Sequence, residues 1–248
     1  MKISVIIPMY NESAIVTDTA RTLTGYLESW CGERGHTFEV LFSNDGSHDD
    51  CGQKAAAWIS DNPLLHGSVR LVEADRNYGK GHAVGLGMAA ASGDFVLYTD
   101  CDLAYGVDVI GEAALLWQEY GCDVLIGSRN LSEDGYAGYT FMRKLASKAY
   151  IKVLCLVAGF RLSDSQCGFK GFSREMGQAV FAENRTWGWA FDIEILLRSL
   201  RKNAVIREMA VKIINHRESK IHLVKDSIRM MRDILKIRKR LKEEAKNK

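Results

Sequence analysis

Two aspartates one residue apart, Asp100 and Asp102, follow the apolar run from Phe95 to Leu97. That run predicts a buried strand, and open α/β sheets bind ligands beyond the carboxyl ends of their strands. Alternate residues of an extended segment project to the same side. Both carboxylates can therefore reach one hard cation such as Mg²⁺ or Mn²⁺, which would hold a diphosphate. Asp-x-Asp also occurs in ordinary solvated turns, so the pair alone leaves both interpretations open.

Polar turns also close the first two strand-like runs. After the first run, Pro8 stops the ladder of a sheet, and a nucleobase could stack on Tyr10. After the second run, Asp45 could accept a hydrogen bond from a base imide or a ribose hydroxyl. Simpler interpretations are a helix N-cap at Ser13 and a turn that only satisfies its own backbone.

A third turn opens a helix-like segment with Gly79, Lys80 and Gly81. Free backbone N–H groups and the positive end of the helix could meet a phosphate there. The spacing matches neither the Walker pattern nor the Gly-x-Gly-x-x-Gly fingerprint. Taken singly, the segment is a helix start.

Strand-like and helix-like segments alternate through the first half of the chain. We expect strands at 3–7, 38–43, 69–73, 95–99 and 123–127, and helices near 14–30, 50–60, 80–91 and 107–120. In the second half we expect a helix near 141–158, a Gly-rich turn around 163–172, a helix near 190–202, a strand at 205–214 and a long helix from about 221. The pattern predicts an α/β fold, with a Rossmann-like, mostly parallel sheet flanked by helices and a C-terminal amphipathic helix.

Length and composition favour one domain with an extension. The 248 residues, 47% of them hydrophobic, are enough for a real core, and no stretch is repetitive or of low complexity. We expect a catalytic domain at 1–215 and a C-terminal helix at 216–248. The six cysteines form no Cys-x-x-Cys pair and no signal peptide is evident, which favours a reducing cytosol. The longest apolar run, 153–160, is well short of the roughly 20 residues that cross a bilayer.

The C-terminal segment is basic and amphipathic. From Arg217 onward it has twelve Lys and Arg against five Asp and Glu. An apolar stripe is expected at Val224, Ile228, Met231 and Leu235, flanked by Leu223, Met230, Ile234 and Leu241. Such a helix can lie in the headgroup plane of an anionic membrane, or it can pack on its own domain or on a partner subunit. Nucleic acid is a poorer partner because no aromatic residues interleave the basic ones.

The order of the edge motifs resembles the family 2 glycosyltransferases of GT-A fold, over nearly the whole chain. The resemblance implies that the nucleotide of a sugar donor is held by Pro8, Tyr10, Asn11, Glu12 and Asp45. It implies that Asp100 and Asp102 bind Mg²⁺ or Mn²⁺ on the diphosphate, with Asp100 also on the donor side. We place Lys80 with the donor as well. The chain departs from the family at Asn44, where Asp is commoner.

Motifs in the second half resemble the polyprenyl-phosphate sugar transferases, which include the dolichyl-phosphate glucose and mannose synthases. They are Gly127-Ser128-Arg129, Arg143 with Ser147, and the segment 164–170. The segments 166–170 and 189–194 look more like the glucosyl branch, because the mannosyl branch usually has Ser-Gly-Phe-Arg and lacks the acid at Asp192. The expected donor is therefore a UDP-sugar, with UDP-glucose favoured.

The resemblance implies an inverting transfer onto a polyprenyl phosphate. Guanidinium groups bind phosphate oxygens bidentately, so Arg129 and Arg143 are the expected acceptor ligands, with Ser147 one helical turn from Arg143. Asp192 and Glu194 either position the acceptor or sugar, or support the helix that carries them. Gln166 is a further expected contact to the donor, and Lys220 is an expected contact to the donor or to the lipid phosphate.

Two other functions stay open at this point. One is a family 2 transferase that acts on a soluble or cell-wall glycan acceptor. The other is a membrane-bound binding module without turnover, against which the intact Asp100 and Asp102 speak. For the enzyme we expect peripheral association with the cytoplasmic face of a membrane, with a membrane-anchor subunit or a homo-oligomer possible.

Overall fold

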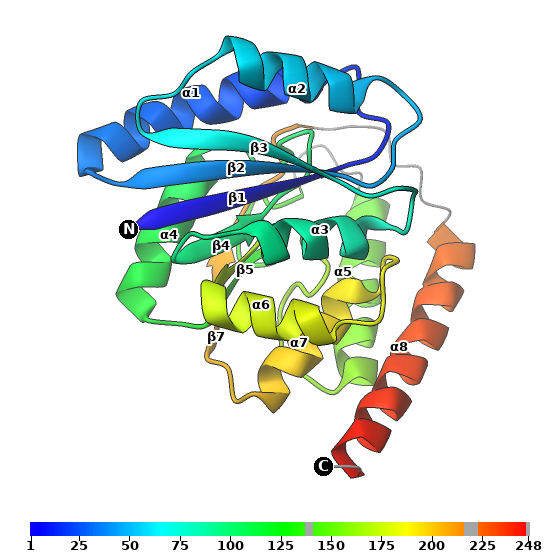
Figure 1. Cartoon of the computed structure of the whole chain (residues 1–248). Helices are drawn as coiled ribbons and strands as arrows, with labels where there is room; N and C mark the ends of the chain where they lie inside the picture. Colours follow the sequence, from blue (N-terminus) through cyan, green and yellow to red (C-terminus); the bar gives the residue numbers. More distant parts are fainter. Residues whose placement is uncertain (137–140, 216–222, 247–248) are drawn as a thin grey trace.

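The structure is a computed structural model and describes residues 1–136, 141–215 and 223–246 (Figure 1). Its elements in chain order are β1 (Lys2–Met9), α1 (Val16–Arg34), β2 (Thr37–Asn44), α2 (Cys51–Asp61), β3 (Gly67–Glu73), α3 (Lys80–Ala90), β4 (Phe95–Tyr98), α4 (Asp108–Tyr120), β5 (Val124–Ser128), α5 (Phe141–Ala158), β6 (Lys170–Ser173), α6 (Arg174–Glu183), α7 (Phe191–Arg201), β7 (Ile206–Ala210) and α8 (Leu223–Lys246).

The strands form one mixed sheet in the order β3-β2-β1-β4-β6-β5-β7. Neighbouring strands are parallel except at β6, which is antiparallel to both β4 and β5. The expected α/β fold with a mostly parallel sheet is therefore confirmed. Because β1, β2 and β4 are parallel, their carboxyl ends meet at one edge.

The strand β6 was not predicted, because the segment 163–172 was taken for a turn, and no element was predicted at the helix α6 that follows it. The four residues of β6, Lys-Gly-Phe-Ser, begin with a charge and a glycine and show no strand alternation. Pairing on both sides stabilises the strand in spite of this weak local preference. The helix α6 did carry a signal, since Ser173 is its N-cap and accepts a hydrogen bond from the N–H of Met176.

Both faces of the sheet are apolar and covered by helices. Along β1, the side chains of Ile3, Val5 and Ile7 lie in one core and that of Ile6 lies in the other, as the two-residue period of a strand requires. The first core is closed by α1 and α4, and the second by α3, α5, α7 and α8. Figure 1 shows α1 and α2 on one side of the sheet and α3 and α6 on the other. The sheet is thus a rigid, doubly covered base for its carboxyl edge.

The apolar stripe of α8 packs on the protein itself. Met230, Ile234, Ile237 and Leu241 belong to the second core, while Leu235 is 58% exposed. Of the predicted stripe, Met231 is partly buried against the same core, Leu235 was wrong because it is exposed, and the side chains of Val224 and Ile228 lie outside the described residues. In the described part of α8, the apolar side chains thus pack on the helix's own domain, one of the predicted roles. Among the described residues, no helix combines the length and the apolar character needed to cross a membrane.

We predict that Ile237→Ala lowers the free energy of unfolding by about 2–5 kcal/mol, because it leaves a cavity between α8 and the domain. Urea unfolding followed by circular dichroism measures the change. The exposed neighbour Leu235→Ala is the control and should change the free energy of unfolding by about 0.5 kcal/mol or less. Equal effects of the two substitutions would contradict the packing of this stripe.

Candidate active site

The carboxyl edge brings the first two predicted turns together. Asp45 follows β2, and its N–H donates to the carbonyl of Met9 at the end of β1 (3.0 Å). Asn11 links the same two turns, since its N–H donates to Ser47 Oγ (3.0 Å) and its Oδ1 accepts from the N–H of His48 (2.9 Å). Asn11 has a φ of 57°, a left-handed conformation that asparagine tolerates. The two turns therefore form one cross-linked rim.

This rim exposes an aromatic ring. Pro8 is buried at the end of β1, whereas Tyr10 is 40% exposed and lies edge-on to His48, with ring centroids 6.2 Å apart. Glu12 lies at the same exit, and its carbonyl accepts from the N–H groups of Ile15 and Val16. An exposed ring on a fixed turn is suited to stacking, so the predicted base contact of Tyr10 remains a prediction that the geometry permits.

The carboxylate of Asp45 holds the turn that begins α3. It is 2% exposed and accepts from the N–H of Gly79 (2.7 Å) and of Tyr78 (3.2 Å). The Nδ1 atom of His82 lies 3.5 Å from it. Asp45 thus fixes the position of Lys80, a role that sequence reasoning did not assign. Its predicted contact with a nucleoside is untested.

Lys80 connects this turn to the acidic pair. Its Nζ forms an ion pair with Oδ1 of Asp100. Burial alone would lower the pKa of Lys80, but Asp100, and with it Asp192, outweighs burial and raises this pKa. The ammonium therefore remains charged beside the carboxylates.

Asp100 is confined on its other side by the turn after residue 165. A Cβ added to Gly168 would lie 2.3 Å from Oδ2 of Asp100, so only glycine permits this approach. In the same turn, Nε2 of Gln166 is buried and has no hydrogen-bond partner among the residues that the structure describes. A buried free donor is unfavourable unless a ligand satisfies it. The predicted contact of Gln166 with the donor stays a prediction.

The donor set at this edge fits a hard divalent ion. Asp100 is partly exposed, and Oδ1 of Asp102 accepts from the N–H of Ala104 (3.1 Å), which orients that carboxylate. Within the described ranges, no three His, Cys, Asp or Glu side chains are grouped as metal ligands. Mg²⁺ and Mn²⁺ do not need such a cage, because they bind through one or two carboxylates and fill the remaining positions with water and phosphate. The residues present therefore fit the predicted ion.

A buried ion pair lies beside the acidic pair. Asp192 begins the first turn of α7, is 7% exposed, and its Oδ1 accepts from Lys170 Nζ (2.7 Å) and from the hydroxyl of Tyr98 (2.5 Å). Burial, with Asp192 second, raises the pKa of Tyr98 well above its usual value, so the hydroxyl stays a donor. Lys170 is fully buried and also donates to the carbonyl of Cys167 (2.5 Å). It thereby links Asp192 to the turn that confines Asp100.

Lys170 was quoted in a motif but given no role from the sequence. The sequence did carry a signal for such a role. Lys170 lies among apolar residues, which favours its burial, and a buried lysine needs a charged partner. Asp192, predicted as catalytic or supporting, is engaged by this lysine. Its oxygen contacts therefore agree with a positioning role.

Glu194 is bound by three arginines. It is fully buried and accepts from the N–H of Arg185 (3.1 Å), from Nε of Arg198 (2.8 Å) and from Nη2 of Arg240 in α8. Both of its oxygens are engaged. Of the two predicted alternatives, these contacts match support of the helix that carries Asp192.

Arg129 follows β5 and is held by a second buried acid. Its Nε and Nη2 donate to Asp164 at 2.6 and 2.9 Å, and its backbone N–H donates to the same carboxylate at 3.2 Å. Burial would lower the pKa of Arg129, but Asp164 outweighs burial and raises it. A guanidinium has five N–H donors, so this pair orients Arg129 without using all of them. Asp164 was named in a sequence motif but was not predicted as a site residue.

Three predicted site residues are not placed by the structure. Arg143 and Ser147 lie in α5, but their side chains are outside the described part, and Lys220 is outside the described residues altogether. Their roles toward the acceptor or donor stay predictions.

Solved structures define the class of fold. Glucosyl-3-phosphoglycerate synthase from Mycobacterium tuberculosis, in a complex with Mn²⁺, UDP and glucosyl-3-phosphoglycerate, superposes with a TM-score of 0.64. The match covers 95% of this chain and 78% of that one, at 19% identity. This likeness confirms the predicted GT-A fold of glycosyltransferases.

Sequence comparison identifies the family. The model of glycosyl transferase family 2 matches residues 4–181. Dolichyl-phosphate beta-glucosyltransferases are similar over almost the whole chain: the one from Drosophila melanogaster is 30% identical over 96% of this chain and 74% of its own length, and the one from Dictyostelium discoideum is 29% identical over 95% and 73%. The chain belongs to glycosyl transferase family 2 and is a glycosyltransferase.

The sequence predicts that the protein binds UDP together with Mn²⁺. We predict that Gly168→Ala weakens this binding by about tenfold or more. The added methyl group displaces Asp100 or the turn that carries it. Titration calorimetry measures the affinity. Gly188→Ala is the matched control because its Cβ would enter open space. An unchanged affinity in Gly168→Ala would show that the position of Asp100 is not required.

We predict that Lys170→Met lowers the free energy of unfolding by about 3–5 kcal/mol, because it leaves the Asp192 carboxylate buried without its ammonium partner. Guanidinium unfolding measures the loss. The double variant Lys170→Met with Asp192→Asn removes both charges and should recover much of it. A double variant no more stable than the single one would contradict the charge-pair argument.

Proposed function

We propose that the chain transfers glucose from UDP-glucose to the phosphate of a polyprenol, with inversion and a β-linked product. The observation that carries the proposal is Asp100, held between Lys80 and Gly168 at the carboxyl edge, in a chain similar over 95–96% of its length to dolichyl-phosphate beta-glucosyltransferases. Inversion is what the resemblance implies.

The acidic pair and its lysine form the donor side. Asp100 and Asp102 would hold a divalent ion, Mg²⁺ or Mn²⁺, whose charge stabilises the departing diphosphate when it is bound. Lys80 adds a fixed positive charge at the same place. The related fold that binds Mn²⁺ and UDP supports this assignment.

The acceptor side centres on Arg129. Asp164 fixes its guanidinium plane, and the remaining N–H donors would orient phosphate oxygens. A phosphate monoester is largely ionised at neutral pH, because its second pKa is about 6. The attacking oxygen therefore needs no strong base, which agrees with an Asp192 carboxylate that is paired with Lys170.

A second candidate is transfer to a water-soluble acceptor that carries a phosphate. It is favoured by one observation, the likeness in fold to a glucosyl-3-phosphoglycerate synthase solved with phosphoglyceric acid. The dolichyl-phosphate relatives, which are more similar in sequence, favour the lipid acceptor.

We predict that the purified chain, assayed in detergent with a panel of sugar nucleotides, glucosylates a polyprenyl phosphate from UDP-glucose. Chelation of divalent ions should abolish transfer, and Asp102→Ala should reduce it by about a hundredfold or more. Asp61→Ala, an exposed aspartate at the end of α2, is the control and should retain activity.

Three outcomes would contradict the proposal. Transfer only to a water-soluble acceptor would exclude the polyprenyl phosphate: phosphoglycerate would establish the second candidate, and a short glycoside would establish transfer to a soluble glycan. A preference for another sugar nucleotide would contradict UDP-glucose as the donor. UDP binding without any turnover would favour a binding module.

A further inference from the structure

One face of α5 is exposed and carries large apolar side chains. Leu145, Val153 and Leu156 are 54%, 47% and 79% exposed. Lys148 and Lys152 lie between them in the sequence and are also exposed. Successive members of this set of five are one, three or four residues apart, so all five lie on one side of the helix. We call them the α5 outer face. Ile151 and Leu154 are buried on the opposite side.

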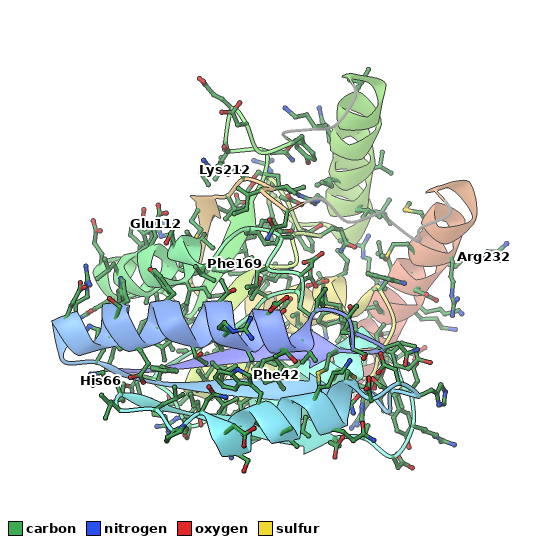
Figure 2. All side chains as sticks on the ribbon, turned by 90° about the horizontal axis from the view of Figure 1, so that it is seen from above. Phe42, His66, Glu112, Phe169, Lys212 and Arg232 are labelled. Carbon is green, nitrogen blue, oxygen red and sulfur yellow. The ribbon has the colours of Figure 1, made fainter. Side chains whose placement is uncertain are left out.

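The charge of this helix has one sign. The α5 sequence contains four Lys and Arg residues and no Asp or Glu. The neighbouring helix α8, which packs beside α5, also exposes basic residues: Lys236 and Lys239 are about four-fifths exposed, although each lies near an acid of the same helix (Asp233 and Glu243), and Figure 2 shows Arg232 pointing away from the protein. An exposed surface that combines apolar side chains with a positive charge is complementary to an anionic lipid headgroup layer.

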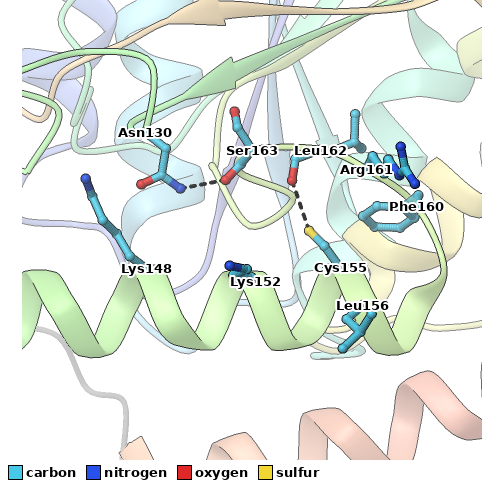
Figure 3. A pocket seen from close by; sticks show the side chains of 9 residues that line it. All are labelled: Asn130, Lys148, Lys152, Cys155, Leu156, Phe160, Arg161, Leu162 and Ser163. Atoms are coloured by element: carbon cyan, nitrogen blue, oxygen red, sulfur yellow. Dashed lines mark hydrogen bonds between the residues drawn. The ribbon is translucent and has the colours of Figure 1, made fainter.

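A pocket of about 530 Å³ opens beside the outer face. Figure 3 shows Lys148, Lys152 and Leu156 of α5 on one side of it and the segment Phe160–Ser163 on the other. Asn130 lines the end of the pocket, where its Nδ2 donates to the carbonyl of Ser163 (2.5 Å).

The pocket borders the proposed acceptor side. Asn130 and Ser163 are the chain neighbours of Arg129 and Asp164, the buried pair described above. A phosphate group carried by a lipid would therefore pass the basic rim of the pocket close to Arg129.

We propose that the α5 outer face docks the protein on a bilayer that contains anionic phospholipid, with the pocket turned toward the headgroups. The apolar side chains reach below the phosphate layer, and Lys148 and Lys152 pair with the phosphates. The inference rests on the proposed function, because it makes the bilayer the source of the acceptor. It places the contact on α5 instead of α8, where the described apolar residues Met230, Ile234, Ile237 and Leu241 are buried in the protein.

Vesicle sedimentation tests the docking surface with the full chain. Wild type should bind vesicles of phosphatidylcholine with phosphatidylglycerol and bind vesicles of phosphatidylcholine alone more weakly. The pair Lys148→Glu with Lys152→Glu should reduce binding to the anionic vesicles by roughly tenfold or more, and Leu156→Ser should reduce it several-fold. Arg21→Glu with Arg34→Glu on α1 makes the same change in net charge at a distant surface, so it should bind nearly as wild type does.

Equal losses in the α5 and α1 variants, or wild-type binding by the α5 variants, would overturn the proposal. Mn²⁺-dependent UDP binding checks that each variant is folded, and it should be unchanged. The two proposals fail separately. If vesicle binding depends on α5 but no transfer to polyprenyl phosphate occurs in detergent, only the proposed function is refuted. If transfer occurs in detergent but the α5 variants bind vesicles as wild type does, only the docking surface is refuted.

Discussion

The organisation of this protein depends on keeping carboxylates close together at the point where β4 leaves the sheet. Like charges at short range repel strongly in a partly buried site. Two lysines compensate, with Lys80 on Asp100 and Lys170 on Asp192. Asp102 adds a third carboxylate that also acts on Lys80. Carboxylate oxygens grouped in this way are suited to a hard divalent cation.

The reversed strand β6 explains how the two halves of the chain meet at this site. Were the sheet parallel throughout, the residues before β6 would lie at the opposite edge. Because β6 runs antiparallel between β4 and β5, its beginning lies beside the end of β4, and Lys170 pairs with Tyr98 in the register. The turn with Gly168 therefore closes over Asp100, although it is nearly 70 residues away in the sequence. One short segment of backbone, 164–168, thus carries both Asp164, the partner of Arg129, and Gly168, which confines Asp100.

Much of the site at the carboxyl edge of the sheet could be predicted from the sequence, because polar residues that follow parallel strands must meet at one side of the sheet. Asp100, Asp102, Asp45 and the turn at Lys80 follow that rule. The rule could not reveal β6, where sheet pairing overrides a sequence that favours a turn. Nor could it assign Lys170 or Asp164, because a buried ion pair is defined by contacts between distant segments. Helical periodicity found an amphipathic α8 but wrongly assigned Leu235 to the buried stripe, since apolar residues occur on adjoining sides of that helix.

Glu194 joins the last helix to the part of α7 that carries Asp192. Its buried carboxylate receives Arg240 from α8 and Arg198 from α7, and Arg198 also pairs with Glu244. A protein shortened before α8 would thus lose a counter-charge for a carboxylate in its interior and expose to water the part of the second core that Ile234 and Ile237 cover. Such a truncation would be an unsuitable soluble version for crystallisation or kinetics, because its behaviour would report damage to the core. Point substitutions on exposed surfaces are the sounder way to separate catalysis from attachment in this chain.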